Sequence, residues 1–203
     1  LAIYNAQIRS LKQQTTKPAP DSREILRISL EKGGTSVLAD GFLVAGDLAP
    51  GEREFCFGFG ALLQLTDDLQ DIGEDLGRGH MTLFSGEAGK PPLDRLVNRL
   101  GRYTSAVIER TLDEGRPRDR ALRVVIPRNC LLMAMESVGV QPAFFSRACV
   151  RAAQEAFPVR FSYLAKLRKK LKGKFEDSTR TISDLDPLTT AFMAVSSRAF
   201  ALG

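Results

Sequence analysis

An acidic patch on a strongly periodic segment constrains this chain more than any other feature of its sequence. The segment runs from Gly60 to Asp75, and a helix that turns about 100° per residue gathers its polar side chains within roughly one quadrant. These are Gln64, Asp67, Asp68, Asp71 and Asp75. Apolar side chains form a second face, made by Leu62, Leu65, Leu69, Ile72 and Leu76. The pattern predicts an α-helix that presents carboxylates between apolar walls.

The energetic cost of these carboxylates points to a bound cation. Like charges at i and i+4 destabilise a helix by about 0.2–0.5 kcal/mol per pair, and acids near its C-terminus oppose the helix dipole. Mg²⁺ takes oxygen ligands, commonly one or two carboxylates together with substrate phosphates. The acidic patch therefore predicts a binding site for a hard cation such as Mg²⁺. The alternative is a solvated acidic face that only aids solubility.

Two overlapping resemblances to known families rest on this segment. The second aspartate-rich motif of the trans-polyprenyl diphosphate synthases resembles Gln64-x-x-Asp67-Asp68-x-x-Asp71, with Gly60 before it and Gly79 and Thr82 after it. The corresponding motif of squalene and phytoene synthases is similar to Leu69-x-Asp71-Ile-Gly-Glu74-Asp75 followed by Arg78-Gly79. Both families share the class I isoprenoid synthase fold. The resemblance, which covers roughly residues 28 to 85, implies an all-α helical bundle around a central cavity.

The resemblance also implies a reaction, the ionisation of an allylic prenyl diphosphate by a Mg²⁺-dependent prenyltransferase. In this interpretation the Mg²⁺ ligands are Asp67, Asp68, Asp71 and Asp75. The first three are also catalytic, because Mg²⁺ bound to the aspartates neutralises the departing pyrophosphate. The substrate diphosphate is met by four further side chains, namely Gln64, Lys32, Arg78 and His80. An apolar cavity keeps water away from the reactive cation.

Two positions depart from the family pattern. The polyprenyl synthases place a Lys-Thr pair before the motif, whereas here Lys32 and Thr35 are separated by two glycines. Lys32 either faces the diphosphate or is an exposed lysine near a helix end. Both families usually have Lys or Arg where His80 stands, so either His80 or Arg78 meets the diphosphate, or His80 is a loop residue without a function.

A facing aspartate motif, which the class I fold requires, is not found among the 66 residues before Asp67. We therefore expect residues 1–203 to form a single all-helical domain that is the C-terminal portion of a larger isoprenoid synthase fold, or a divergent member with a one-sided metal site. A non-catalytic partner subunit or prenyl-lipid-binding protein of the same fold is the alternative function. A solvated acidic helix with neither property is the third interpretation.

Composition excludes several other classes of protein. The three cysteines Cys56, Cys130 and Cys149 are far apart and form no CxxC pair, which argues against a zinc site or a disulfide framework. His80 is the only histidine, and no P-loop or Gly-x-Ser-x-Gly motif is present. No run of about 18 apolar residues is present. We expect a cytoplasmic protein with reduced cysteines, and a homodimer.

Positive charge is concentrated near the end of the chain. The net charge is +5, and residues 151–180 contain nine Lys and Arg against three acids. The stretch from Lys166 to Lys174 is interpreted first as a solvated helix face, and alternatively as a peripheral contact with an anionic membrane. RNA binding is a weaker interpretation, because no aromatic interleaving or nucleic-acid module accompanies the charges. We expect no nucleic-acid partner.

Periodicity and breaker residues predict helices throughout and no strand. The predicted helices cover residues 1–14, 21–32, 35–44, 52–76, 93–114, 119–138, 143–172 and 186–202. Gly33-Gly34 is predicted to break or kink a helix, as are Pro127 and Pro158, and residues 85–92 are predicted to form a flexible loop. The phenylalanines of the motif helix, Phe55, Phe57 and Phe59, either line the cavity or belong to the core.

Overall fold

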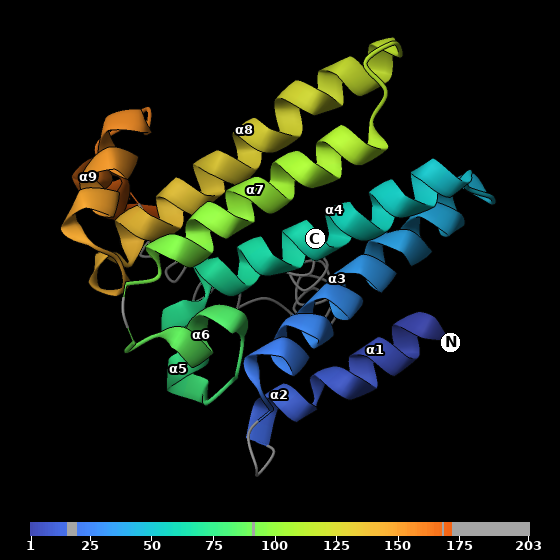
Figure 1. The fold of residues 1–203 in the computed structure, drawn as a ribbon. Coiled ribbons are helices and arrows are strands. Elements are labelled where there is room, and N and C mark those ends of the chain that lie inside the picture. The colour runs from blue at the N-terminus through green and yellow to red at the C-terminus, as the bar shows by residue number, and fades with distance from the viewer. Residues whose placement is uncertain (16–19, 91, 168, 172–203) are drawn as a thin grey trace, which may run out of the picture. The chain divides into compact units, whose positions relative to one another are not determined.

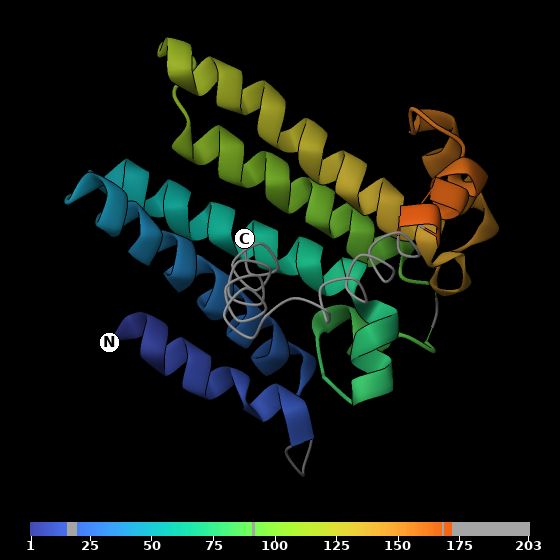
Figure 2. The same ribbon diagram turned by 180° about the vertical axis from the view of Figure 1, so that it is seen from behind.

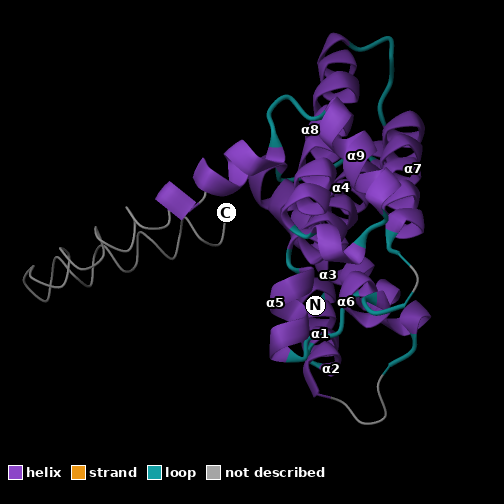
Figure 3. Cartoon of the chain, turned by 90° about the vertical axis from the view of Figure 1, so that its left-hand side faces the viewer, coloured by secondary structure: helices purple, strands orange, loops and turns teal. Residues whose placement is uncertain are grey.

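The protein is all-α, as the sequence predicts. The computed structural model describes residues 1–15, 20–90, 92–167 and 169–171, and these residues form helices and loops without a β-strand (Figure 3). The chain divides into two compact units, Leu1–Phe157 and Pro158–Gly203. In the second unit the structure describes residues 158–167 and 169–171, and those from 161 onward are helical.

Five helices of the first unit lie side by side in the order α1, α3, α4, α7, α8 (Figures 1 and 2). Their bounds are Ala2–Ser10 for α1, Ser22–Ala45 for α3, Pro50–Gln70 for α4, Asp94–Thr111 for α7 and Pro117–Val140 for α8. The remaining elements are α2 (Lys12–Thr15), α5 (Ile72–Arg78), α6 (Leu83–Glu87), the 3-10 helix η1 (Pro142–Phe144) and α9 (Arg147–Ala156). The α3–α4 pair positions the predicted site.

Close packing of α3 against α4 explains a wrong prediction. Gly33 and Gly34 do not break the helix, since α3 continues from Ser22 to Ala45. A Cβ atom on Gly33 would overlap the carbonyl oxygen of Gly60, and one on Gly60 would overlap the carbonyl oxygen of Gly33. A Cβ on Gly34 would overlap the ring of Phe57. The missing side chains of these glycines therefore let the backbones of α3 and α4 pack closely together.

Helix boundaries follow local capping chemistry. Asp21 caps α3, because its carboxylate accepts hydrogen bonds from the backbone N–H groups of Arg23 (2.9 Å) and Glu24 (2.7 Å). Gly79 ends α5 with φ of 68°, a left-handed conformation that glycine adopts without strain.

The motif helix predicted over residues 52–76 is divided. The helix α4 ends at Gln70, and α5 begins at Ile72 on the far side of Asp71. The backbone hydrogen bonds Asp71 N to Asp67 O (3.0 Å) and Asp75 N to Asp71 O (2.8 Å) keep the two helices connected across this change of direction.

Several other boundaries differ from the sequence prediction. The first helix is interrupted at Leu11, and residues predicted as a loop after Ser85 belong partly to α6. The helix α8 continues through Pro127. The long helix predicted over residues 143–172 is divided into η1, α9 and a further helix that begins at residue 161. The break after α9 covers Phe157–Arg160 and includes Pro158. Residues 16–19 and the helix predicted at 186–202 lie outside the described part of the chain.

The apolar face of the motif forms the centre of the core. Leu62, Leu65, Leu69 and Ile72 are buried as predicted, whereas Leu76 is 45% exposed. All three cysteines are free thiols. Within the described ranges, no helix has both the length and the apolar content that crossing a membrane requires.

Candidate functional site

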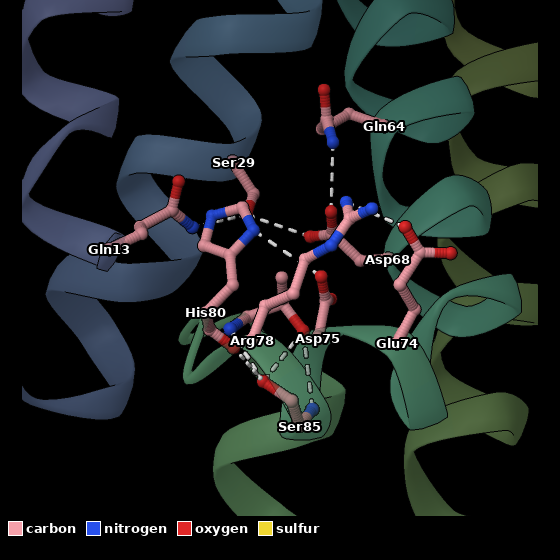
Figure 4. Close-up of polar contacts among 10 residues, drawn as sticks. Gln13, Ser29, Gln64, Asp68, Glu74, Asp75, Arg78, His80 and Ser85 are labelled. Atoms are coloured by element: carbon pink, nitrogen blue, oxygen red, sulfur yellow. Dashed lines mark hydrogen bonds and ion pairs between the residues drawn. The ribbon is translucent and has the colours of Figure 1, made fainter. Parts of the chain in front are cut away.

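Five of the predicted site residues, namely Gln64, Asp68, Asp75, Arg78 and His80, lie near one another where α4 is followed by α5 (Figure 4). Lys32 is on α3, Gln64, Asp67 and Asp68 are on the last turns of α4, Asp71 joins α4 to α5, Asp75 and Arg78 are on α5, and His80 follows it. The charge of Asp75 raises the pKa of Asp68, and the charge of Lys32 lowers it. The charges of Asp67 and Asp75 raise the pKa of Asp71. We call Asp67, Asp68, Asp71 and Asp75 the acidic cluster.

Asp68 is held inside the protein by hydrogen bonds. Its side chain is 4% exposed, and its two oxygens accept hydrogen bonds from Ser29 Oγ (2.8 Å) and Gln64 Nε2 (2.8 Å). Gln13, which is also buried, donates to Ser29 Oγ at 3.4 Å. A continuous polar chain therefore connects the segment before α3 with α3 and α4.

Burial raises the pKa of Asp68 to about 6. Removal from water disfavours the charged carboxylate, and the hydrogen bonds from Gln64 and Ser29 and the charge of Lys32 only partly offset this. Asp68 is thus mainly ionised at pH 7 but protonated in mild acid.

Asp75 is the second buried aspartate and is less completely satisfied. It is 7% exposed, and its Oδ1 lies 3.3 Å from Nδ1 of His80. Burial raises its pKa, while His80 and the nearby Thr82 hydroxyl act in the opposite direction. No donor of the described residues meets Oδ2 of Asp75 with hydrogen-bonding geometry. The backbone N–H of His80 donates to the carbonyl of Asp75 at 2.8 Å, which folds the following loop over this carboxylate.

Asp67 and Asp71 are the solvent-accessible members of the acidic cluster. They lie one helical turn apart, as the backbone hydrogen bond between them shows. Partial burial and the charges of Asp67, Glu74 and Asp75 raise the pKa of Asp71, and Arg78 lowers it. Because carboxylates repel one another here, a cation at this surface is electrostatically favourable.

The basic residues beside the cluster already contact acids. Arg78 Nη1 lies 2.6 Å from Glu74 Oε1, and both side chains are largely exposed. His80 faces Asp75. Lys32 is half-buried on α3, and its charge lowers the pKa of Asp68. An anion bound here would exchange these exposed ion pairs for contacts of its own.

Sequence reasoning did not assign Ser29, Gln13 or Ser85 to the site. Ser85 donates its hydroxyl to the carbonyl oxygen of His80 (2.8 Å), and Thr82 caps α6 by accepting from the backbone N–H of Ser85 (3.2 Å). The sequence does contain a signal for a buried polar role of Ser29, since this polar residue lies one turn before Gly33 on a helix face that is otherwise buried. Gln13 had none, because the polar run Lys12-Gln13-Gln14 is typical of a surface.

The described residues hold no ready-made metal site of three or more Asp, Glu, His or Cys side chains. Both oxygens of Asp68 are engaged by Ser29 and Gln64. Asp67 and Asp71 provide accessible carboxylate oxygens, the donor type that Mg²⁺ prefers, and Mg²⁺ commonly completes its shell with water and substrate phosphate. The residues present fit a Mg²⁺ ion that is shared with a diphosphate.

The other residues that the sequence analysis singled out, the phenylalanines of the motif helix and the basic stretch, are not members of the acidic cluster. Phe55 and Phe59 stack with ring centroids 5.6 Å apart, and all three phenylalanines of the motif helix are half-buried. Phe57 borders an open groove of about 550 Å³ with Leu38, Tyr103 and Val107. Of the basic stretch beginning at Lys166, the described lysines are exposed and the other basic residues lie outside the description.

Comparisons with protein-family models, with curated proteins and with solved structures give no match for this chain.

Proposed function

We propose that this protein is a Mg²⁺-dependent prenyltransferase of the class I isoprenoid synthase type that ionises an allylic prenyl diphosphate. The observation that supports it best is the accessible carboxylate pair Asp67 and Asp71, within a segment that resembles the second aspartate motif of that family. The charge of Arg78 acts on Asp71. The helical architecture is compatible with this reaction class.

Asp67 and Asp71 would hold Mg²⁺ in this proposal, together with the substrate diphosphate. The ion supplies Lewis-acid neutralisation of the pyrophosphate that leaves. Lys32, Arg78 and His80 would bind the remaining negative charge of the diphosphate in this proposal. Arg78 is the most accessible of the three, and an exposed ion pair such as that with Glu74 costs little to exchange.

The buried residues of the site would act by positioning. Ser29 and Gln64 hold Asp68 between α3 and α4, and this fixes the end of α4 that carries Asp67 and Asp71. His80 and Asp75 hold the loop after α5. These contacts reduce the number of arrangements that the exposed carboxylates can adopt before substrate binds.

The apolar groove at Phe57 is the proposed location of the prenyl chain. Phe57 and Gln64 are seven residues apart on α4, which places them on one helix face about 10 Å apart along the axis. Leu38, Val107 and Tyr103 form the apolar part of the lining with Phe57, and the charged residues Arg53, Glu54 and Arg110 also border the groove. A diphosphate at Asp67 would therefore leave its hydrocarbon chain to run along α4 toward this groove.

The decisive measurement is pyrophosphate release from farnesyl or geranylgeranyl diphosphate in the presence of Mg²⁺. We expect release that is lost in the double variant Asp67→Asn/Asp71→Asn. Asp40→Asn is the matched control, because Asp40 is an exposed acid on α3 outside the acidic cluster. Absence of turnover with every allylic diphosphate would contradict the proposal.

A non-catalytic prenyl-diphosphate-binding partner subunit is the second proposed function. One observation favours it, namely that two of the four aspartates, Asp68 and Asp75, are buried among internal contacts. Binding of farnesyl diphosphate without turnover, together with copurification of a catalytic homologue, would support this function over the first. The predicted homodimer and the membrane contact through Lys166 to Lys174 stay predictions.

A further inference from the structure

A second candidate binding site lies at the other end of α6 from the acidic cluster. The start of α6 is capped by Thr82, and its last residue, Glu87, borders a groove of about 350 Å³ between the beginnings of α3 and α7. Ser22 of α3 and Lys90 of the following loop also line the groove. We call it the α6–α7 groove.

The groove carries an excess of positive charge. Glu87 is its only acid, and the carboxylate is engaged by Lys90 Nζ (2.9 Å) and by the hydroxyl of Ser22 (3.1 Å). The contact with Lys90 lowers the pKa of Glu87, so this carboxylate is ionised at neutral pH and neutralises one lysine. Arg95 and Arg99 line the same groove, and neither has an ion pair with any residue that the structure describes.

The two arginines are arranged to act together. Arg95 and Arg99 are exposed and lie one turn apart on α7, so their side chains project from the same helix face. Guanidinium groups are planar forks of N–H donors, and they match phosphate oxygens better than the point charge of lysine does. A doubly charged anion would balance the two unpaired cations.

The walls of the groove between these charges are apolar. Leu93 is 3% exposed, and Leu96, Leu83 and Pro92 extend the apolar lining. The volume lies at the lower end of the range for small-molecule pockets. The groove therefore favours a ligand that combines an anionic head with a compact apolar portion over a bare inorganic ion.

We propose that the α6–α7 groove binds the phosphate group of a small phosphorylated organic molecule, with Arg95 and Arg99 holding the phosphate and Leu93 and Leu96 contacting the apolar portion. This inference does not rest on the proposed function, since it uses none of the residues of the acidic cluster.

Isothermal titration of the full chain with phenyl phosphate in EDTA tests the proposal. EDTA removes divalent cations, so the acidic cluster does not contribute to phosphate binding. We expect phenyl phosphate to bind more tightly than inorganic phosphate and phenol not to bind. The variant Arg95→Gln/Arg99→Gln should lose affinity about tenfold or more, because two charge-assisted contacts are removed.

Two further variants make the test specific. Arg120→Gln/Arg128→Gln removes two exposed arginines of α8 that do not line the groove, and it should bind phenyl phosphate as the unmodified protein does. Glu87→Gln should bind several-fold more tightly, because it removes the only acid of the groove. All variants should keep the helical circular dichroism spectrum, since the substituted side chains lie at the surface.

The source of the phosphate is tested with vesicles that contain phosphatidic acid. If the vesicles retain the protein and phenyl phosphate displaces it, the ligand is a lipid headgroup. If the vesicles do not retain the protein, the ligand is a soluble phosphate ester. Either result supports the groove if Arg95→Gln/Arg99→Gln abolishes phosphate binding. Undetectable binding of phenyl phosphate, unchanged affinity in Arg95→Gln/Arg99→Gln, or equal affinity for inorganic phosphate would overturn the proposal.

Discussion

Asp67 and Asp68 are neighbours in the chain, yet they occupy opposite environments. Asp67 is exposed and lies one turn from Asp71, whereas Asp68 is buried between α3 and α4 and accepts hydrogen bonds from Ser29 and Gln64. Consecutive residues on a helix are rotated by about 100°, so one turns toward α3 and the other toward solvent. The comparison teaches that an aspartate-rich motif can contain carboxylates that are accessible to a ligand and carboxylates that support helix packing.

The largest expected effect comes from separating the helices that bury Asp68. Gly60→Ala places a Cβ against the carbonyl oxygen of Gly33 and against Val37, and we expect unfolding free energy to fall by about 3 kcal/mol. Gly77→Ala is the control, because a Cβ there meets no other atom and alanine favours a helix. Chemical denaturation of both variants measures the difference, and equal stabilities would contradict the close-packing argument.

Asp68 should make the free energy of unfolding depend on pH. The pKa of Asp68 is about 6 in the folded protein, above the ordinary 3.8. The neutral carboxyl suits burial, so its stabilising contribution is complete below about pH 4 and is lost as pH rises through about 6. This difference between the two pKa values of Asp68 corresponds to at most about 3 kcal/mol of unfolding free energy.

Unfolding measured in EDTA from pH 4 to pH 7 tests this dependence. Wild type should lose stability relative to Asp68→Asn over that interval, because asparagine does not titrate. A constant difference between the two proteins would show that Asp68 has the same pKa folded and unfolded.

Ligand binding should depend on the exposed pair. We expect Mg²⁺ with pyrophosphate to stabilise the protein by about 2.7 kcal/mol at a ligand concentration 100-fold above Kd. The stabilisation should disappear in Asp67→Asn/Asp71→Asn, whose stability without ligand should be close to that of wild type. Thermal denaturation with and without ligand measures both quantities, with Asp40→Asn as the control. Retained stabilisation in the double variant would remove these carboxylates from the site.

Truncation of the buried aspartate should reveal its supporting role. Asp68→Ala leaves the hydroxyl of Ser29 and the amide of Gln64 without their acceptor, and we expect a loss of about 1–3 kcal/mol at pH 7. Asp67→Ala, one residue away, should change stability by less than about 0.5 kcal/mol. Urea denaturation compares the two, and similar losses would mean that the structural distinction between these neighbours has no energetic counterpart.

The smallest effect is expected on the exposed rim of the site. Arg78→Ala removes an i, i+4 ion pair with Glu74, and we expect stability to fall by only about 0.3–0.5 kcal/mol. If Arg78 binds the diphosphate, the affinity for farnesyl diphosphate should fall much more than stability does. Arg120→Ala serves as the charge-matched control for affinity, because Arg120 is an exposed arginine of α8 that lines neither groove. Unchanged affinity in Arg78→Ala would leave Lys32 and His80 as the candidate anion contacts.

The sequence alone determined the all-α class and the apolar helix face of Leu62, Leu65 and Leu69. The cap at Asp21 and the left-handed end at Gly79 follow the same local chemistry. These features depend on neighbours within one or two helical turns, and periodicity and capping chemistry report such neighbours directly. The same locality placed Gln64 and the acidic cluster near one another before any fold was known.

Only the tertiary structure decided which aspartates are accessible and how the glycines are used. Gly33 and Gly34 carry the local signal of a helix break, but that signal is overridden because Gly60 and Phe57 pack against them from another helix. Likewise Ser29 lies 39 residues before Asp68, and Gln13 lies 16 residues before Ser29. Contacts between distant segments depend on how helices pack, and no periodicity within one segment encodes them.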